Sequence, residues 1–333
     1  MNDSDDSLQP PPSTRNRRTA ILRIASAFGV ALAFSLSIYT LIAVTQPSEG
    51  LVGFSFLLVL PAVLSAFVAY VADPWAERPL RFYLLIPFWI ILAVMVISGP
   101  LLKEGVICIL MLSPLWMVSG MIGTGIAWKV RNRVNRGKTY CAALLALPLL
   151  AMQVEPHIPI PVSHASVSRS IIVNASPQRL WPLLEGVPDV QPTEGRWTIA
   201  HNLIRLPRPV GAHLAGSGIG ADRHAEWSGH IRFRESITRW EPGRHIGWAF
   251  HFDDKSGWDI TDHHLMPDGP HMVIESGGYS MEPLAPGRTR LTLETRYRMH
   301  SLLSGYAALW GELFLGDLEN NVLTIIRDRA ERR

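Results

Sequence analysis

The stretch Ser236–Phe250, SITRWEPGRHIGWAF, decides the fold of the second half of the chain. It consists of a strand-like run, a Pro242-Gly243 turn and a second run rich in aromatic and apolar residues. Two such runs joined by a short turn that contains glycine are typical of an antiparallel hairpin. We therefore expect a β-sheet in this half of the chain.

The alternation of apolar and polar residues continues on both sides of this hairpin. It is clearest in Thr289–His300, where Leu291, Leu293, Thr295, Tyr297 and Met299 share one face. One buried and one solvated face is the pattern of an antiparallel sheet. The periodicity predicts strands at Val167–Ser176, Arg223–Trp227, Ile231–Trp240, His245–Phe252, Met272–Glu282 and Thr289–His300.

Two helices accompany these strands. The first follows Ser176, a residue typical of a helix N-cap, and has Pro177 at its first position. The second is long, at about Leu302–Arg332, and ends the chain. Its apolar stripe has helical spacing: Tyr306, Leu309, Trp310, Leu313, Phe314, Leu318, Val322, Leu323 and Ile326. The fold class that follows is α+β, an antiparallel sheet wrapped on a long C-terminal helix.

This order of elements resembles the START and polyketide-cyclase-like (SRPBCC, helix-grip) superfamily. The resemblance covers Val167–Arg333 and rests on the segments SIIVNASPQRLWPLL, GIGADRHAEWSGHIRFRESITRWEPGRHIGW and GYSMEPLAPGRTRLTLETRYRM. It implies a cavity between sheet and helix that takes an apolar ligand. The superfamily includes lipid carriers, hormone receptors, cyclases and ring-hydroxylase domains, so the resemblance does not choose a reaction.

The first half of the chain has the composition of a membrane region. Residues 1–152 hold 12 Lys/Arg, 7 Asp/Glu and no His, and the basic residues lie at the ends of apolar runs. This distribution favours membrane orientation over a nucleic-acid surface, so we expect no nucleic-acid partner. Four runs approach or exceed the roughly 20 residues that a spanning helix needs: Ile24–Val44, Leu51–Val71, Phe82–Ser98 and Gly105–Trp128.

A fifth apolar segment, Thr139–Val154, is short and contains Pro148. It either spans the bilayer or lies in the interface, and its lack of charge favours spanning. Eleven basic residues then fall on the side of the N-terminus, and Lys103 alone falls on the other. We expect an integral membrane protein of the cell inner membrane, with a cytoplasmic N-terminus and an extracytoplasmic C-terminal domain. The predicted organisation is a disordered tail at 1–19, four to five transmembrane helices at 20–154, a linker at 155–166 and a soluble domain at 167–333.

A hairpin turn at Ser228–His230 sets a register in which three pairs of residues lie opposite each other. Trp227 then faces Ile231, Ala225 faces Phe233, and Arg223 faces Glu235, all on the apolar side. An arginine and a carboxylate among apolar walls form either a structural ion pair or a functional anchor or acid/base pair.

The segment WDITDHHLMPDGPH, Trp258–His271, concentrates acidic residues and histidines. Asp262 and His264 share a face at strand spacing, so His264 is a candidate catalytic residue. A solvated turn and a metal site are the alternatives. The spacing matches no standard zinc motif, and the sequence contains no cofactor motif, so we predict neither a metal nor a cofactor.

Aromatic residues of the sheet and the last helix are candidate ligand contacts, with core packing as the alternative. The candidates are Trp227, Phe233, Trp248, Phe250, Tyr279, Tyr297 and Trp310. The leading function is membrane-anchored binding or transport of a lipid or other apolar small molecule. The alternatives are a cyclase- or dehydratase-like enzyme, with Arg223, Glu235 and His264 or Tyr297 as acid/base groups, and a ligand-sensing membrane protein. The sequence leaves the oligomeric state open.

Overall fold

The computed structural model describes residues 14–45, 53–73, 77–102, 106–133, 141–255, 258 and 266–332. The chain divides into two compact units. The first comprises Met1–Lys103 and Leu112–Ile158, and the second Glu104–Met111 and Pro159–Arg333.

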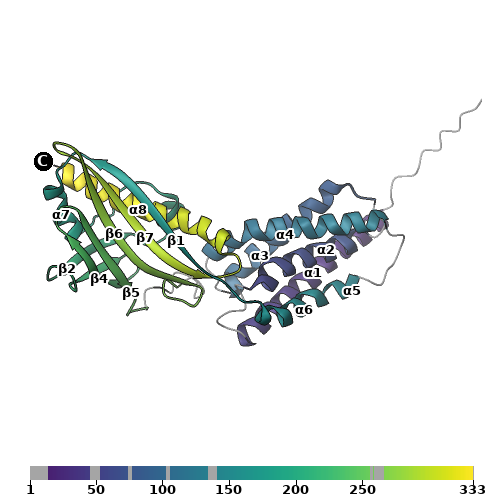
Figure 1. The fold of residues 1–333 in the computed structure, drawn as a ribbon. Helices are drawn as coiled ribbons and strands as arrows, with labels where there is room; N and C mark the ends of the chain where they lie inside the picture. Colours follow the sequence, from purple (N-terminus) through teal and green to yellow (C-terminus); the bar gives the residue numbers. More distant parts are fainter. Residues whose placement is uncertain are drawn as a thin grey trace, which may run out of the picture. The chain divides into compact units, whose positions relative to one another are not determined.

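The first unit is helical (Figure 1). Its main helices are α1 (Thr14–Thr45), α2 (Leu60–Ala72, preceded by the π-helical turn Ser55–Val59), α3 (Leu80–Leu102) and, from Leu112 onward, α4 (Val106–Arg133). Within the described residues, three stretches are long and apolar enough to cross a membrane: Arg18–Ile42, Ser55–Ala72 and Ile109–Arg131. The third predicted span falls in α3, whose described apolar stretch, Leu80–Val96, is shorter.

The fifth apolar segment forms two short helices, α5 (Cys141–Leu144) and α6 (Ala146–Val154). Together they extend over about 21 Å at about 1.5 Å per residue, less than the roughly 30 Å of a bilayer core. That this segment crosses the membrane stays a prediction.

The second unit contains a seven-stranded antiparallel sheet with the order β1-β7-β6-β5-β4-β3-β2. The strands are β1 (Val162–Val173), β2 (Pro209–Ala215), β3 (Asp222–Trp227), β4 (Ile231–Glu241), β5 (His245–His251), β6 (Met272–Ala285) and β7 (Arg288–His300). The predicted strands are confirmed, although β1 begins at Val162, inside the stretch expected to be a linker. β2 was not predicted, because its sequence PVGAHLA lacks a run of β-branched residues and is interrupted by Gly211.

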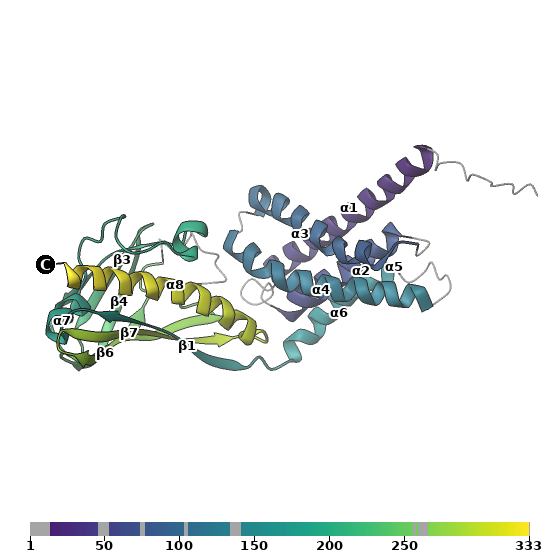
Figure 2. The same cartoon turned by 90° about the horizontal axis from the view of Figure 1, so that it is seen from above.

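Three helical elements accompany the sheet: α7 (Pro177–Glu185), a π-helical turn at Ile199–Leu203, and α8 (Ser304–Glu331). Figure 2 shows α8 lying along one face of the sheet, close to β1 and β7. The fold class is therefore α+β with a long C-terminal helix on an antiparallel sheet, as predicted.

The core lies between this helix and the inner face of the sheet. Leu291 and Leu293 of β7 contribute to it together with Leu323 and Ile326 of α8. The predicted stripe of α8 is wrong at Leu309, whose side chain is 69% exposed. The buried residues of α8 lie from Gly316 onward, so the helix turns its apolar stripe to the sheet mainly in its second half.

Candidate functional site

A cavity of about 280 Å³ lies between the inner face of the sheet and α8. Strands β2 to β7, the connection before β2 and the helix all contribute to its wall. The wall is predominantly apolar and includes Val187, Ala225, Trp227, Ile231, Phe233, Trp248, Phe250, Phe252, Met272, Ile274, Leu293, Phe314, Leu318, Val322 and Ile325.

Arg223 and Glu235 are cross-strand partners in this wall. The register of β3 and β4 pairs Arg223 with Glu235, Ala225 with Phe233 and Trp227 with Ile231, so the predicted register is confirmed. Arg223 Nε donates to Glu235 Oε2 at 2.5 Å, and each residue is only 4% exposed. Two opposite charges are thus buried together among apolar neighbours.

Arg223 has further partners that hold its guanidinium in place. Its Nη1 donates to the carbonyl of Leu184, near the end of α7, at 2.6 Å. Its Cζ lies 4.2 Å from the ring centroid of Trp248, within the range of a cation–π contact. Burial acts to lower the pKa of Arg223, but the neighbouring Glu235 and Tyr279 outweigh it and raise that pKa. The arginine therefore stays charged, with its charge neutralised by Glu235.

Glu319 of α8 is a second carboxyl group in the cavity wall, and sequence reasoning missed it. The residue is 3% exposed, and neither carboxyl oxygen has a hydrogen-bond partner of acceptable geometry in the described part of the chain. Burial raises the pKa of Glu319 to about 8, against the smaller lowering effects of a poorly aligned hydrogen bond with the Thr295 side chain and of the charge of Arg169. A carboxyl group of this kind is largely protonated at neutral pH.

The position of Glu319 on its helix could have identified it from the sequence as a buried carboxyl group. It lies four residues after Leu315 and four before Leu323, and therefore on the face of α8 that packs on the sheet. An acidic residue within an apolar stripe is costly unless it is paired or protonated.

Trp248 of β5 lines the same cavity as Glu319. It pairs with Gly277 of β6, which in turn pairs with Thr295 of β7. A Cβ atom at Gly277 would lie about 3 Å from Cε2, Cζ2 and Nε1 of the indole, so the glycine leaves the space that the indole occupies. Trp248 is 3% exposed, and within the described residues its Nε1 has no hydrogen-bond partner.

Tyr279 completes the polar part of the wall. Its ring centroid lies 5.3 Å from that of Trp248, and the Cζ of Arg223 lies 5.6 Å from its ring. Burial raises the pKa of Tyr279 to about 12, so its hydroxyl remains protonated.

The structure brings most of the predicted site residues together. Trp227, Phe233, Trp248, Phe250 and Tyr279 all line the cavity with Arg223 and Glu235.

Tyr297 and Trp310 are not among the residues that line the cavity. Tyr297 shares the inner face of β7, but Ala307 and Ala308 of α8 cover it together with Met299. Trp310 packs against Tyr306 and Phe314 on the helix. Tyr297 therefore packs between β7 and α8, and the aromatic contacts of Trp310 lie within α8.

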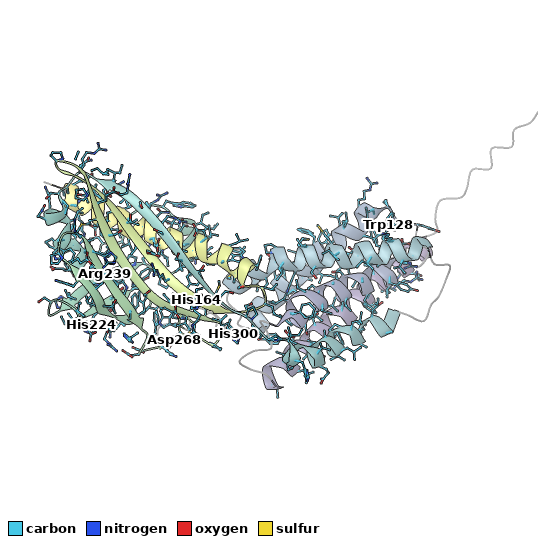
Figure 3. The ribbon with its side chains drawn as sticks, in the orientation of Figure 1. Trp128, His164, His224, Arg239, Asp268 and His300 are labelled. Atoms are coloured by element: carbon cyan, nitrogen blue, oxygen red, sulfur yellow. The ribbon has the colours of Figure 1, made fainter. Side chains whose placement is uncertain are left out.

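His264 lies outside the described residues, as do Asp259, Asp262 and His263. Asp268 from the same segment forms an ion pair with Lys255 at 2.8 Å. His224, labelled in Figure 3, follows Arg223 on β3 and is exposed. Because successive side chains of a strand alternate, it lies on the opposite face of the sheet. In the part of the chain that the structure describes, no group of three or more His, Cys, Asp or Glu side chains is placed to hold a metal ion.

No known protein family matches the sequence of the chain, and no curated protein matches it. Among solved structures, truncated norcoclaurine synthase from Thalictrum flavum is 11% identical, with 52% of this chain and 98% of that chain covered and a TM-score of 0.33. The Zhui aromatase/cyclase from Streptomyces sp. R1128 is 16% identical, covers 51% and 96% of the two chains, and has a TM-score of 0.32. The di-domain ARO/CYC BexL from the BE-7585A biosynthetic pathway is 14% identical, covers 64% and 63%, and has a TM-score of 0.33.

Such low identities and TM-scores carry no conclusion about the ligand or the reaction. The helix-grip resemblance of the C-terminal half rests on its own topology, a curved antiparallel sheet with a long last helix along its inner face.

Proposed function

We propose that the C-terminal domain binds an apolar small molecule in the cavity between sheet and α8, and that the N-terminal helices hold it beside a bilayer. The observation that carries this proposal is the cavity itself, about 280 Å³ in volume with a predominantly apolar wall. Ligand sites are concave, mostly apolar and supplied with a few polar groups.

The volume limits the size of the ligand. Ligand pockets commonly measure roughly 300–1,000 Å³, and an engineered apolar cavity of about 150 Å³ binds benzene. A cavity of 280 Å³ thus suits a molecule of one or two rings, or one short chain. The sequence predicted a lipid or other apolar small molecule. Under this proposal, a cavity of this volume restricts the lipid to one with a single chain or a compact body.

Anchorage in the membrane is the second part of the proposal. Three described stretches are long and apolar enough to cross a bilayer. The eleven-to-one distribution of basic residues favours a cytoplasmic N-terminus and an extracytoplasmic ligand-binding domain. A carrier or receptor in this position would exchange an apolar molecule with the nearby bilayer.

An enzyme that acts on an apolar substrate, similar to a cyclase or dehydratase, is the second candidate. The observation that favours it is Glu319, a carboxyl group with a pKa of about 8 in the same wall as Arg223 and Glu235. A group with a pKa near the working pH suits general acid catalysis.

Naphthalene binding to the full-length protein in lipid nanodiscs tests the proposed function. Titration calorimetry, with empty nanodiscs as the blank, should show saturable binding at one site per chain. Ala225→Leu adds bulk to the cavity wall, so this variant should bind at least tenfold more weakly. Ala215→Leu is the matched control, because Ala215 is exposed on the neighbouring strand β2 and does not line the cavity.

Saturable binding that Ala225→Leu leaves unchanged would place the ligand elsewhere. The absence of saturable binding to the wild-type protein would contradict the proposed function for ligands of this class.

A further inference from the structure

The hydrogen-bonding capacity of two buried polar groups in the cavity wall is not satisfied within the fold. Trp248 Nε1 has no hydrogen-bond partner in the described residues, although the residue is only 3% exposed. The carboxyl group of Glu319, also 3% exposed, forms no well-aligned hydrogen bond there, and the Thr295 side chain is the one group near enough to act as a partner. Leaving such groups unsatisfied is costly, so each orphan in a folded protein needs an explanation.

The two groups belong to one region of the cavity. The indole of Trp248 lies over Gly277, whose other cross-strand neighbour is Thr295. The side chain of Thr295 is also near enough to Glu319 to lower the pKa of its carboxyl group through a hydrogen bond. Tyr279 neighbours both groups, since its ring contacts Trp248 and its hydroxyl is affected by the charge of Glu319.

We propose that Trp248 Nε1 and the Glu319 carboxyl group together bind an oxygen-bearing polar group, a hydroxyl or a carbonyl, on an otherwise apolar ligand. This inference rests on the proposed function and names the class of molecule that the cavity takes.

The chemistry of the two groups defines this class. The indole N–H only donates, whereas a protonated carboxyl group both donates and accepts. A hydroxyl satisfies both groups, a carbonyl oxygen accepts from both, and a pure hydrocarbon satisfies neither. An anionic head group fits poorly, because Arg223 is the only cationic residue in the described cavity wall and Glu235 already neutralises it.

A pair of probes that differ by one hydroxyl tests the inference. Naphthalene and 2-naphthol are titrated into the full-length protein in nanodiscs, with empty nanodiscs as the blank. The wild-type protein should bind 2-naphthol at least about tenfold more tightly than naphthalene, because only 2-naphthol satisfies the buried groups.

Three variants assign this preference to the two groups. Glu319→Leu and Trp248→Phe remove the polar atoms but keep the bulk, so the preference, taken as the ratio of the two affinities within each variant, should fall below about threefold. Glu319→Gln keeps a donor and an acceptor and should retain most of the preference. Thermal melting of each variant shows whether it is folded before it is titrated.

The outcomes separate this inference from the function on which it rests. If naphthalene binds but 2-naphthol binds no better, or if the preference survives in Glu319→Leu, the inference is overturned while the proposed function stands. A buried water bound to both groups would satisfy them with either probe, and the two probes would then bind equally. If neither probe binds the wild-type protein, the proposed function fails and the inference fails with it.

Discussion

Arg223 and Glu235 place two charges inside an apolar wall, and the contacts around each charge offset the cost of burying it. The guanidinium has the carboxylate of Glu235, the carbonyl of Leu184 and the face of Trp248 as partners. Removing one member would leave the other charge buried and uncompensated, which is far more costly than losing both.

The first prediction concerns this pair. Arg223→Met should lower the free energy of unfolding by about 3–5 kcal/mol, whereas the double variant Arg223→Met/Glu235→Leu should cost much less. Urea denaturation of the detergent-solubilised full-length protein, followed by tryptophan fluorescence, measures both. A single variant as stable as the wild-type protein would contradict the prediction. Naphthalene titration of a stable double variant then separates a ligand role from a purely structural one.

The second prediction concerns Glu319 and pH. Its pKa is about 8 in the folded protein, against an ordinary value of 4.5, and Arg169, Glu312 and Glu294 are the charged groups that act on it. The folded state keeps a proton that the unfolded state releases, so this contribution to stability is complete below pH 4.5 and is lost as the pH rises through 8.

The wild-type protein should therefore lose up to about 1.4 kcal/mol of stability per pH unit in this range relative to Glu319→Gln. Melting temperatures of the two proteins between pH 5 and pH 9 measure the difference. Parallel curves would show that Glu319 does not titrate as we describe.

Residue-level prediction from the sequence succeeded where a short turn fixed the geometry. The turn between β3 and β4 determines the partner of Arg223, because side chains alternate along each strand. The burial of Glu319 could have been read from its place in the apolar stripe of α8. That it meets Trp248 in one cavity could not be predicted, since this depends on how β5, β6 and α8, distant in sequence, come together.

At the scale of elements, α8 determines whether the cavity exists. Its second half supplies Leu323 and Ile326 to the core, and its middle supplies Phe314, Leu318 and Glu319 to the cavity wall. The apolar spacing predicted the helix and its stripe. It did not show that Leu309 is exposed while its neighbours Ala307 and Ala308 pack on Tyr297 of the sheet, because the face that a helix buries is a tertiary property.

The third prediction compares two residues of this helix. Ile326 is fully buried, so Ile326→Ala should cost about 2–5 kcal/mol. Leu309→Ala is the control and should change stability by less than about 0.5 kcal/mol, because the side chain is 69% exposed. The urea denaturation described above measures both. Equal losses in the two variants would mean that the helix packs on the sheet through a different face.

At the scale of the whole molecule, the chain joins a set of apolar helices to an antiparallel sheet with a long C-terminal helix and an apolar cavity. Hydropathy was sufficient to find the apolar segments, because spanning a bilayer imposes a minimum length. It was not sufficient to settle the fifth segment, whose two short helices together are shorter than a bilayer core.

The fourth prediction concerns topology. A phosphatase reporter that is active only outside the cytoplasm should be active when fused after Arg333 and inactive when fused after Arg133, because the basic residues mark the cytoplasmic side. Activity after Arg133, or inactivity of an expressed fusion after Arg333, would reverse the proposed placement of the domain.

Native mass spectrometry of the full-length protein, released from detergent after purification from its own membranes, tests the central claim most directly. The wild-type protein should carry one small molecule per chain, with an apolar body and a hydroxyl or carbonyl group, and Ala225→Leu should lose it while Ala215→Leu retains it. A wild-type protein that is free of any such molecule, or an equal load on Ala225→Leu, would contradict the claim that this cavity is the ligand site.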